Sequence, residues 1–134
     1  MADTMTISFP GGARVRAEYE GFTVETDQPV DDGGENSASA PFDLFLISIG
    51  TCAGHYARKF LEQRKLSTEG LRVELTTIKV PERKLLSEIA IRLALPENFP
   101  KKYEKAIVKA IDSCTVKKTI LDPPVFNISV EAGK

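Results

Sequence analysis

Two cysteines, Cys52 and Cys114, are the residues of this chain best suited to nucleophilic or redox chemistry. The thiolate is the reactive form of cysteine, so a reactive cysteine needs a neighbour that stabilises negative charge. His55, one helical turn after Cys52, is the nearest ionisable candidate. Arg14 and Arg16 on an early strand are better candidates, because arginine keeps its charge beside a thiolate.

The same residues also have purely structural interpretations. Buried free cysteines are commonly inert core residues, and a thiol in apolar surroundings has a raised pKa. A lone histidine is often a surface residue, and Arg14 and Arg16 fit a strand face turned to solvent. Two cysteines are too few for a four-cysteine zinc site, and the spacing to His55 supports none. We therefore expect no metal and no cofactor.

Length and composition predict one domain over residues 1–134. The net charge of -1 gives no basic surface for nucleic acid. The longest apolar stretch, residues 41–53, is too short to span a membrane. Residues 1–8 lack the pattern of a secretion signal, so we expect a cytoplasmic protein that binds neither nucleic acid nor membrane.

The sequence pattern predicts where each element lies around the cysteines. The N-terminal half should form a three-stranded meander, a loop of about fourteen residues that is either functional or a flexible connector, and a long helix over residues 41–65. Its first half is apolar all round and should be buried, while its polar second half should reach solvent. The expected strands are residues 6–9, 13–19 and 22–26.

The second half of the chain should form a hairpin, two helices and a final strand. The residues expected in these elements are 71–80 and 86–95, then 101–113 and 116–121, then 125–130. This order predicts an α+β fold with helices on one face of antiparallel sheets. The long central helix has more apolar surface than one small sheet can cover, so we expect a dimer that encloses it.

The two cysteines should occupy different positions. Cys52 lies inside the long helix, whereas Cys114 lies where one helix ends and a shorter one begins. If Cys114 is at the start of that shorter helix, free N–H groups should favour its thiolate. One central and one helix-end cysteine suit an attacking and a resolving role.

Two segments resemble the cysteine motifs of the osmotically inducible protein C and organic hydroperoxide resistance family (OsmC/Ohr). Residues 39–54, SAPFDLFLISIGTCAG, match the first motif, and residues 112–120, DSCTVKKTI, match the second. The Gly-rich loop around residues 33–37 and the PGG turn at residues 10–12 also fit. The order and spacing of elements agree over nearly the whole chain.

The resemblance implies an OsmC-like fold, an intertwined homodimer and a thiol peroxidase. By this analogy Cys52 attacks a small hydroperoxide and Cys114 resolves the sulfenic acid as a disulfide. A dithiol, or a lipoylated protein in the organic hydroperoxide branch, would then reduce the pair. An arginine from the N-terminal strands, Arg14 or Arg16, would lower the cysteine pKa.

The sequence departs from the characterised peroxidases at two positions. Their glutamate after the motif proline is replaced by Phe42, and their Cys-Pro dipeptide by Cys114 and Thr115. Glu35 in the long loop is a candidate substitute for the glutamate. The chain thus resembles a divergent branch described as a redox protein. A different thiol or persulfide enzyme, and a non-catalytic dimeric binding domain, are the alternative functions.

Overall fold

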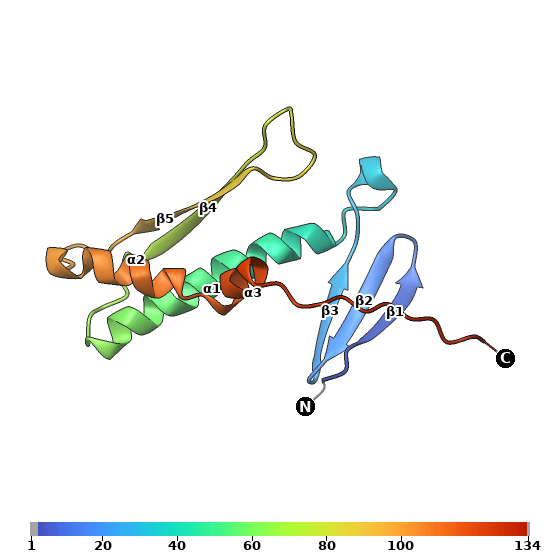
Figure 1. Ribbon diagram of the computed structural model, residues 1–134, viewed down its shortest axis with the longest axis horizontal. Coiled ribbons are helices and arrows are strands. Elements are labelled where there is room, and N and C mark those ends of the chain that lie inside the picture. Colours follow the sequence, from blue (N-terminus) through green and yellow to red (C-terminus); the bar gives the residue numbers. More distant parts are fainter. Residues whose placement is uncertain (1–2, 134) are drawn as a thin grey trace. The chain divides into compact units, whose positions relative to one another are not determined.

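The computed structural model describes residues 3–133, which group into two compact units, residues 3–47 and 48–133. The helix α1 (Pro41–Gln63) begins in the first unit and continues into the second (Figure 1).

The first unit contains an antiparallel sheet in the order β1-β2-β3. Its strands are β1 (Thr6–Gly11), β2 (Arg14–Tyr19) and β3 (Phe22–Thr26), as the sequence predicted apart from small shifts at the ends. Val15, Ala17 and Tyr19 lie opposite Thr26, Val24 and Phe22, so the alternation in β2 places them on one face of the sheet.

The long loop after β3 folds around a buried carboxylate. The side chain of Asp27 is 1% exposed and accepts hydrogen bonds from the backbone N–H of Gln28, Glu35 and Ser37, and from the Ser37 hydroxyl. The short 3-10 helix η1 (Val30–Asp32) lies inside this loop. Gly34 approaches the backbone so closely that a Cβ would lie 2.0 Å from the Gln28 carbonyl oxygen. The loop is thus a defined structure rather than a simple connector.

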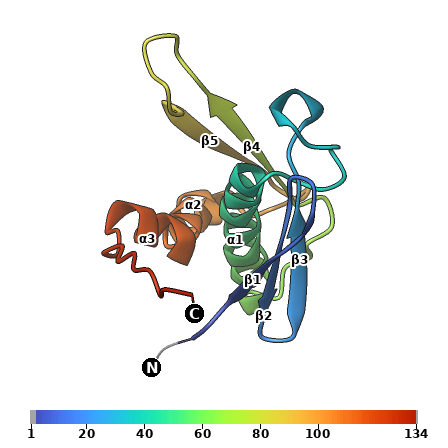
Figure 2. The ribbon, with the colours of Figure 1, turned by 90° about the vertical axis from the view of Figure 1, so that its right-hand side faces the viewer.

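The second unit packs the later part of α1 against a hairpin and a helix (Figures 1 and 2). The hairpin strands are β4 (Arg72–Ile78) and β5 (Glu88–Ala94), in which Val73, Leu75 and Thr77 lie opposite Leu93, Ile91 and Ile89. The 3-10 turn η2 (Lys101–Tyr103) leads into α2 (Glu104–Asp112), and α3 (Thr115–Leu121) follows. The core consists of Ala53, Ala57, Phe60, Leu61, Ile107 and Ile111.

The burial of α1 differs from the expectation. Its buried residues begin at Ile49 and continue through Phe60 and Leu61, whereas Phe42 and Ile47 in the apolar first half are 52% and 49% exposed. In the second half, small and apolar residues face the core while Arg58 and Glu62 form an ion pair on the outer side. An apolar helix surface can be covered either by other parts of the same chain or by another molecule, and its sequence does not distinguish the two.

The predicted strand over residues 125–130 is wrong for this chain. Residues 123–133 form neither helix nor strand, and Val125, Ile128 and Val130 are more than 90% exposed. Alternation of apolar and polar residues defines the two faces of a strand, but a strand also needs a hydrogen-bonded neighbour. No such neighbour pairs with this segment among the described residues.

Candidate active site

Cys52 lies on α1, one helical turn after Ile49 and beside Ala53, both of which are buried. Its own side chain is only partly buried, and the thiol is free. The helix therefore holds Cys52 at the border of the core.

Cys114 lies at the junction of α2 and α3 and is 2% exposed. The apolar stripe of α2 continues to this residue, as predicted, because Ile107 and Ile111 precede it at helical spacing in the core. The backbone of Cys114 is not helical (φ -51°, ψ 126°), so it forms the N-cap of α3. Its carbonyl oxygen accepts the first α3 hydrogen bond, from the N–H of Lys118.

The structure brings the two thiols together. Burial raises the pKa of Cys52, but hydrogen bonds from the Cys114 thiol and from the N–H groups of Val116 and Thr115 outweigh it and lower that pKa below the ordinary value. All three donors come from the start of α3 or its N-cap. Donors to the charged form stabilise a thiolate, and no cation is among the groups that lower this pKa.

The pKa of Cys114 moves in the opposite direction. Burial raises it, and the hydrogen bond and negative charge shared with Cys52 raise it further, which outweighs hydrogen bonds from Lys117 and Val116. The N–H groups at the start of α3 do favour the Cys114 thiolate, as expected, but burial and the neighbouring Cys52 outweigh them, so the pKa of Cys114 is raised. Because the pKa of Cys52 is lowered and that of Cys114 is raised, Cys52 is the thiol of the pair that loses its proton first.

A side-chain contact joins the two helices that carry the cysteines. The hydroxyl of Tyr56 on α1 lies 3.1 Å from the Thr115 Oγ1, and either group can donate the hydrogen bond. Tyr56 is one helical turn after Cys52, and Thr115 follows Cys114 directly. This bond therefore helps to hold the start of α3 against Cys52. It joins residues 59 positions apart, so local sequence patterns do not predict it.

The candidate cations have other partners. His55 is exposed, contacts Arg58 through Nδ1 at 3.3 Å, and is not among the groups that shift the Cys52 pKa. Arg14 and Arg16 belong to the first unit, where Arg14 donates to the Gly11 carbonyl and Arg16 forms an ion pair of 3.3 Å with Glu25. The Arg16 Nε is buried and lacks a hydrogen-bond partner among the described residues.

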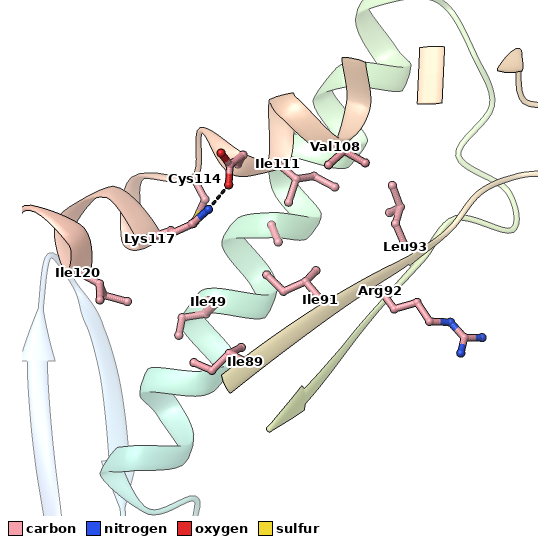
Figure 3. Close-up of a pocket in the computed structure, with 12 residues that line it drawn as sticks. Ile49, Ile89, Ile91, Arg92, Leu93, Val108, Ile111, Cys114, Lys117 and Ile120 are labelled. Atoms are coloured by element: carbon pink, nitrogen blue, oxygen red, sulfur yellow. Dashed lines mark hydrogen bonds and ion pairs between the residues drawn. The ribbon is translucent and has the colours of Figure 1, made fainter. Parts of the chain in front are cut away.

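A pocket of about 610 Å³ opens beside Cys114 within the second unit (Figure 3). Eight of its twelve lining residues have hydrocarbon side chains, contributed by α1, β5, α2 and α3: Ile49, Ala53, Ile89, Ile91, Leu93, Val108, Ile111 and Ile120. Asp112 and Lys117 form an ion pair at its wall. Cys114 lines this pocket, and Cys52 does not.

Among residues 3–133, no three His, Cys, Asp or Glu side chains gather into a set that could hold a metal ion. No helix in that range is long and apolar enough to cross a membrane.

Comparison with known proteins assigns the family. The model of the OsmC-like protein family matches residues 34–129, which include both cysteines and most of the chain. The chain belongs to the OsmC-like family. No curated protein sequence matches it.

Solved structures of OsmC-like proteins share the fold of this chain. A protein from Psychrobacter arcticus 273-4, described as an osmotic stress induced and detoxification response protein, has a TM-score of 0.74 at 22% identity and covers 89% of this chain and 88% of its own. An organic hydroperoxide resistance protein OsmC from Legionella pneumophila has a TM-score of 0.60 at 22% identity, covering 87% and 88%. An OsmC-like protein from Mycoplasma pneumoniae has a TM-score of 0.70 at 14% identity, covering 92% and 89%.

The mixed α and β elements with antiparallel sheets therefore form an OsmC-like fold.

Proposed function

We propose that this OsmC-like protein is a thiol peroxidase that reduces organic hydroperoxides and acts in oxidative stress defence. One observation carries the proposal: a partly exposed cysteine of lowered pKa contacts a buried cysteine of raised pKa. The accessible thiolate suits attack on a peroxide, and the buried thiol suits resolution.

The proposed reaction has two steps at the cysteine pair. The Cys52 thiolate attacks one peroxide oxygen, the O–O bond breaks, and the departing alkoxide takes a proton, leaving an alcohol and a Cys52 sulfenic acid. The Cys114 sulfur then attacks the Cys52 sulfur, a disulfide forms, and water leaves. The thiols already share a hydrogen bond, so the second step requires only local movement to reach disulfide distance.

Arg14 and Arg16 enter the proposal as cations that further stabilise the Cys52 thiolate. Arg16 has a buried Nε without a partner among the described residues, which suits a donor to an anionic group. Arg16→Gln and Arg14→Gln, each assayed for the pH dependence of Cys52 alkylation, test this role. At least one substitution should raise the Cys52 pKa, and no change in either variant contradicts the role.

We also infer that the protein works as a homodimer. Both the first part of α1 and residues 125–130 expose large apolar side chains, and exposed apolar surface can mark an interface. A second copy of the chain would cover them and supply the strand neighbour that residues 125–130 lack. A dithiol or a lipoylated protein is the expected reductant.

Turnover assays test the enzymatic function. Wild type, Cys52→Ser and Cys114→Ser are supplied with cumene hydroperoxide or hydrogen peroxide and a dithiol, and peroxide loss is followed. Wild type should consume the organic peroxide far faster than a free thiol does, and Cys52→Ser should abolish this rate. If wild type and Cys52→Ser consume peroxide equally, the proposal is wrong.

A further inference from the structure

The hydrogen bond between Tyr56 and Thr115 joins the two helices that carry the cysteines, and the reaction proposed above gives it no role. Tyr56 lies one helical turn after Cys52 on α1, and Thr115 is the first residue of α3. Their hydroxyl oxygens are 3.1 Å apart. The backbone N–H of the same Thr115 donates to the Cys52 sulfur. Thr115 therefore connects the Tyr56 hydroxyl to the thiol of Cys52.

The rest of α3 contributes little to the position of this helix. None of its seven residues is buried, and Ile120 and Leu121 at its far end are 44% and 72% exposed. Residues 122–133 then form neither helix nor strand. A segment with few buried apolar contacts opens locally at a low cost in free energy. Single hydrogen bonds at the start of α3 therefore matter for where this helix lies.

We propose that Tyr56 is a positioning residue for both steps at the cysteine pair, and that its hydroxyl holds the start of α3 against Cys52 through Thr115. This inference rests on the proposed function, because it concerns the attack on the peroxide and the formation of the disulfide. Tyr56 acts through Thr115 and takes no part in making or breaking bonds.

The first consequence concerns the thiolate of Cys52. The N–H groups of Thr115 and Val116 donate to Cys52 and lower its pKa. Hydrogen bonds weaken steeply when their distance or angle departs from the preferred range. These donors belong to α3, so they would lose their effect if α3 moved away from α1. The bond between Tyr56 and Thr115 therefore increases the fraction of Cys52 that is thiolate at neutral pH.

The second consequence concerns the resolving step. Cys114 directly precedes Thr115 and is the N-cap of α3, so the bond that holds Thr115 also keeps Cys114 close to the oxidised Cys52. When the Cys114 sulfur attacks the Cys52 sulfenic acid, an S–S bond forms and the S–O bond breaks. The departing hydroxide takes the Cys114 proton and leaves as water. Without the Tyr56 hydroxyl this step should be slower, and the sulfenic acid should persist for longer.

The first test measures the pKa of Cys52 without any peroxide. Alkylation of Cys52 by iodoacetamide is followed against pH by peptide mass analysis in reduced wild type, Tyr56→Phe and Thr115→Val. Each substitution removes one hydroxyl and keeps the Thr115 N–H. Each should raise the Cys52 pKa by about half a unit, which is within the net contribution of one hydrogen bond. The double variant should match either single variant, because the two hydroxyls form one bond.

Control variants remove the same kind of hydroxyl from other positions. Tyr103→Phe changes a tyrosine at the start of α2, and Thr119→Val changes a threonine whose hydroxyl donates within α3, to the Thr115 carbonyl. Both should keep the wild-type Cys52 pKa, and so should Thr115→Ser, which retains a hydroxyl. A wild-type Cys52 pKa in Tyr56→Phe overturns the proposal, and so do additive effects of Tyr56→Phe and Thr115→Val.

The second test follows the resolving step. One equivalent of cumene hydroperoxide is added together with dimedone, which captures sulfenic acids, and the ratio of the Cys52 adduct to the Cys52–Cys114 disulfide is measured by mass. Tyr56→Phe should raise this ratio about threefold, as expected for the loss of one hydrogen bond, and Tyr103→Phe should match wild type. An unchanged ratio in Tyr56→Phe overturns the proposal. If wild type does not react with the peroxide, the proposed function is wrong, whereas the alkylation test still decides whether Tyr56 positions the donors to Cys52.

Discussion

At the scale of single residues, the central feature is the division of charge between two neighbouring thiols. Cys52 and Cys114 have the same side chain, yet burial and hydrogen bonding move their pKa values in opposite directions. Neutral donors at the start of α3 lower the Cys52 pKa. Although Cys114 is the N-cap of α3, the donors at this helix start lower the pKa of Cys52.

This division predicts the effect of changing Cys114. Cys114→Ala removes the side-chain donor to Cys52, whereas Cys114→Ser keeps a hydroxyl that can donate. The Cys52 pKa should rise in Cys114→Ala and stay lower in Cys114→Ser. Alkylation rate against pH measures it: in wild type the midpoint of the curve should lie at a lower pH than that of a free thiol. Equal pKa values in the two variants would contradict the role of the Cys114 donor.

The buried carboxylate of Asp27 should make the stability of the folded protein depend on pH. Hydrogen bonds from the Ser37 side chain and backbone, and from the N–H of Gln28 and Glu35, lower its pKa from 3.8 to about 2. The folded protein therefore binds this proton more weakly than the unfolded chain does. Its stabilising contribution is complete above about pH 4 and is lost as the pH falls toward 2.

Asp27→Asn should accordingly destabilise the protein near neutral pH, and the difference from wild type should shrink below pH 4. Urea unfolding at a series of pH values measures both proteins. A difference that is the same at pH 3 and at pH 7 would show that the carboxylate charge does not matter.

At the scale of elements, the end of α1 shows how local bonding sets a boundary. The Leu66 N–H donates to the Leu61 carbonyl and the Lys65 N–H to the Glu62 carbonyl, which is the Schellman pattern. Leu66 packs against the core that contains Leu61. Lys65 takes the left-handed conformation (φ 55°) that glycine usually occupies. The helix therefore ends at Gln63, two residues earlier than its sequence predicts.

Lys65→Gly should stabilise the protein by about 1 kcal/mol, because glycine has no Cβ to strain in the left-handed region. Lys65→Ala is the matched control, since it removes the same charge but keeps a Cβ. Chemical denaturation should rank the glycine variant above the alanine variant. The opposite order would mean that the backbone strain at Lys65 is negligible.

The sequence predicted most elements because periodicity is a local property. The alternation in β4 and β5 and the apolar stripe of α2 each identified an element and its buried face. Other features depended on contacts between distant residues and could not be predicted. Asp27 meets Ser37 only after the loop closes, and Tyr56 meets Thr115 only after α3 reaches α1. The opposite pKa shifts of the two cysteines also need that packing.

At the scale of the whole molecule, exposed apolar surface is the main feature that one chain does not explain. Phe42 and Phe45 stack with ring centroids 5.6 Å apart, yet both are exposed. Residues 125–130 alternate like a strand but lie extended and exposed. The sequence pattern predicted a strand over residues 125–130 and a buried first half of α1, and one chain forms neither. A pattern of apolar residues does not say whether the same chain or a second copy supplies the neighbour.

The proposed dimer predicts that one side of residues 125–130 is essential for association. Phe126→Asp with Ile128→Asp places two charges on the apolar side of the alternation. Asn127→Asp with Ser129→Asp places the same two charges on the other side. The first pair should convert a dimer to a monomer in light scattering, and the second should leave the dimer. A monomeric wild type, or an unaffected first variant, would contradict the prediction.

The most direct test of the cysteine peroxidase is the mass of the protein after one turnover with cumene hydroperoxide. Reduced wild type and Cys114→Ser are mixed with one equivalent of peroxide in a stopped-flow instrument, and the products are quenched and weighed. The proposed mechanism predicts that wild type loses two hydrogen atoms as the Cys52–Cys114 disulfide forms, and that Cys114→Ser gains one oxygen at Cys52. Unchanged masses, or oxidation no faster than that of a free thiol, would contradict it.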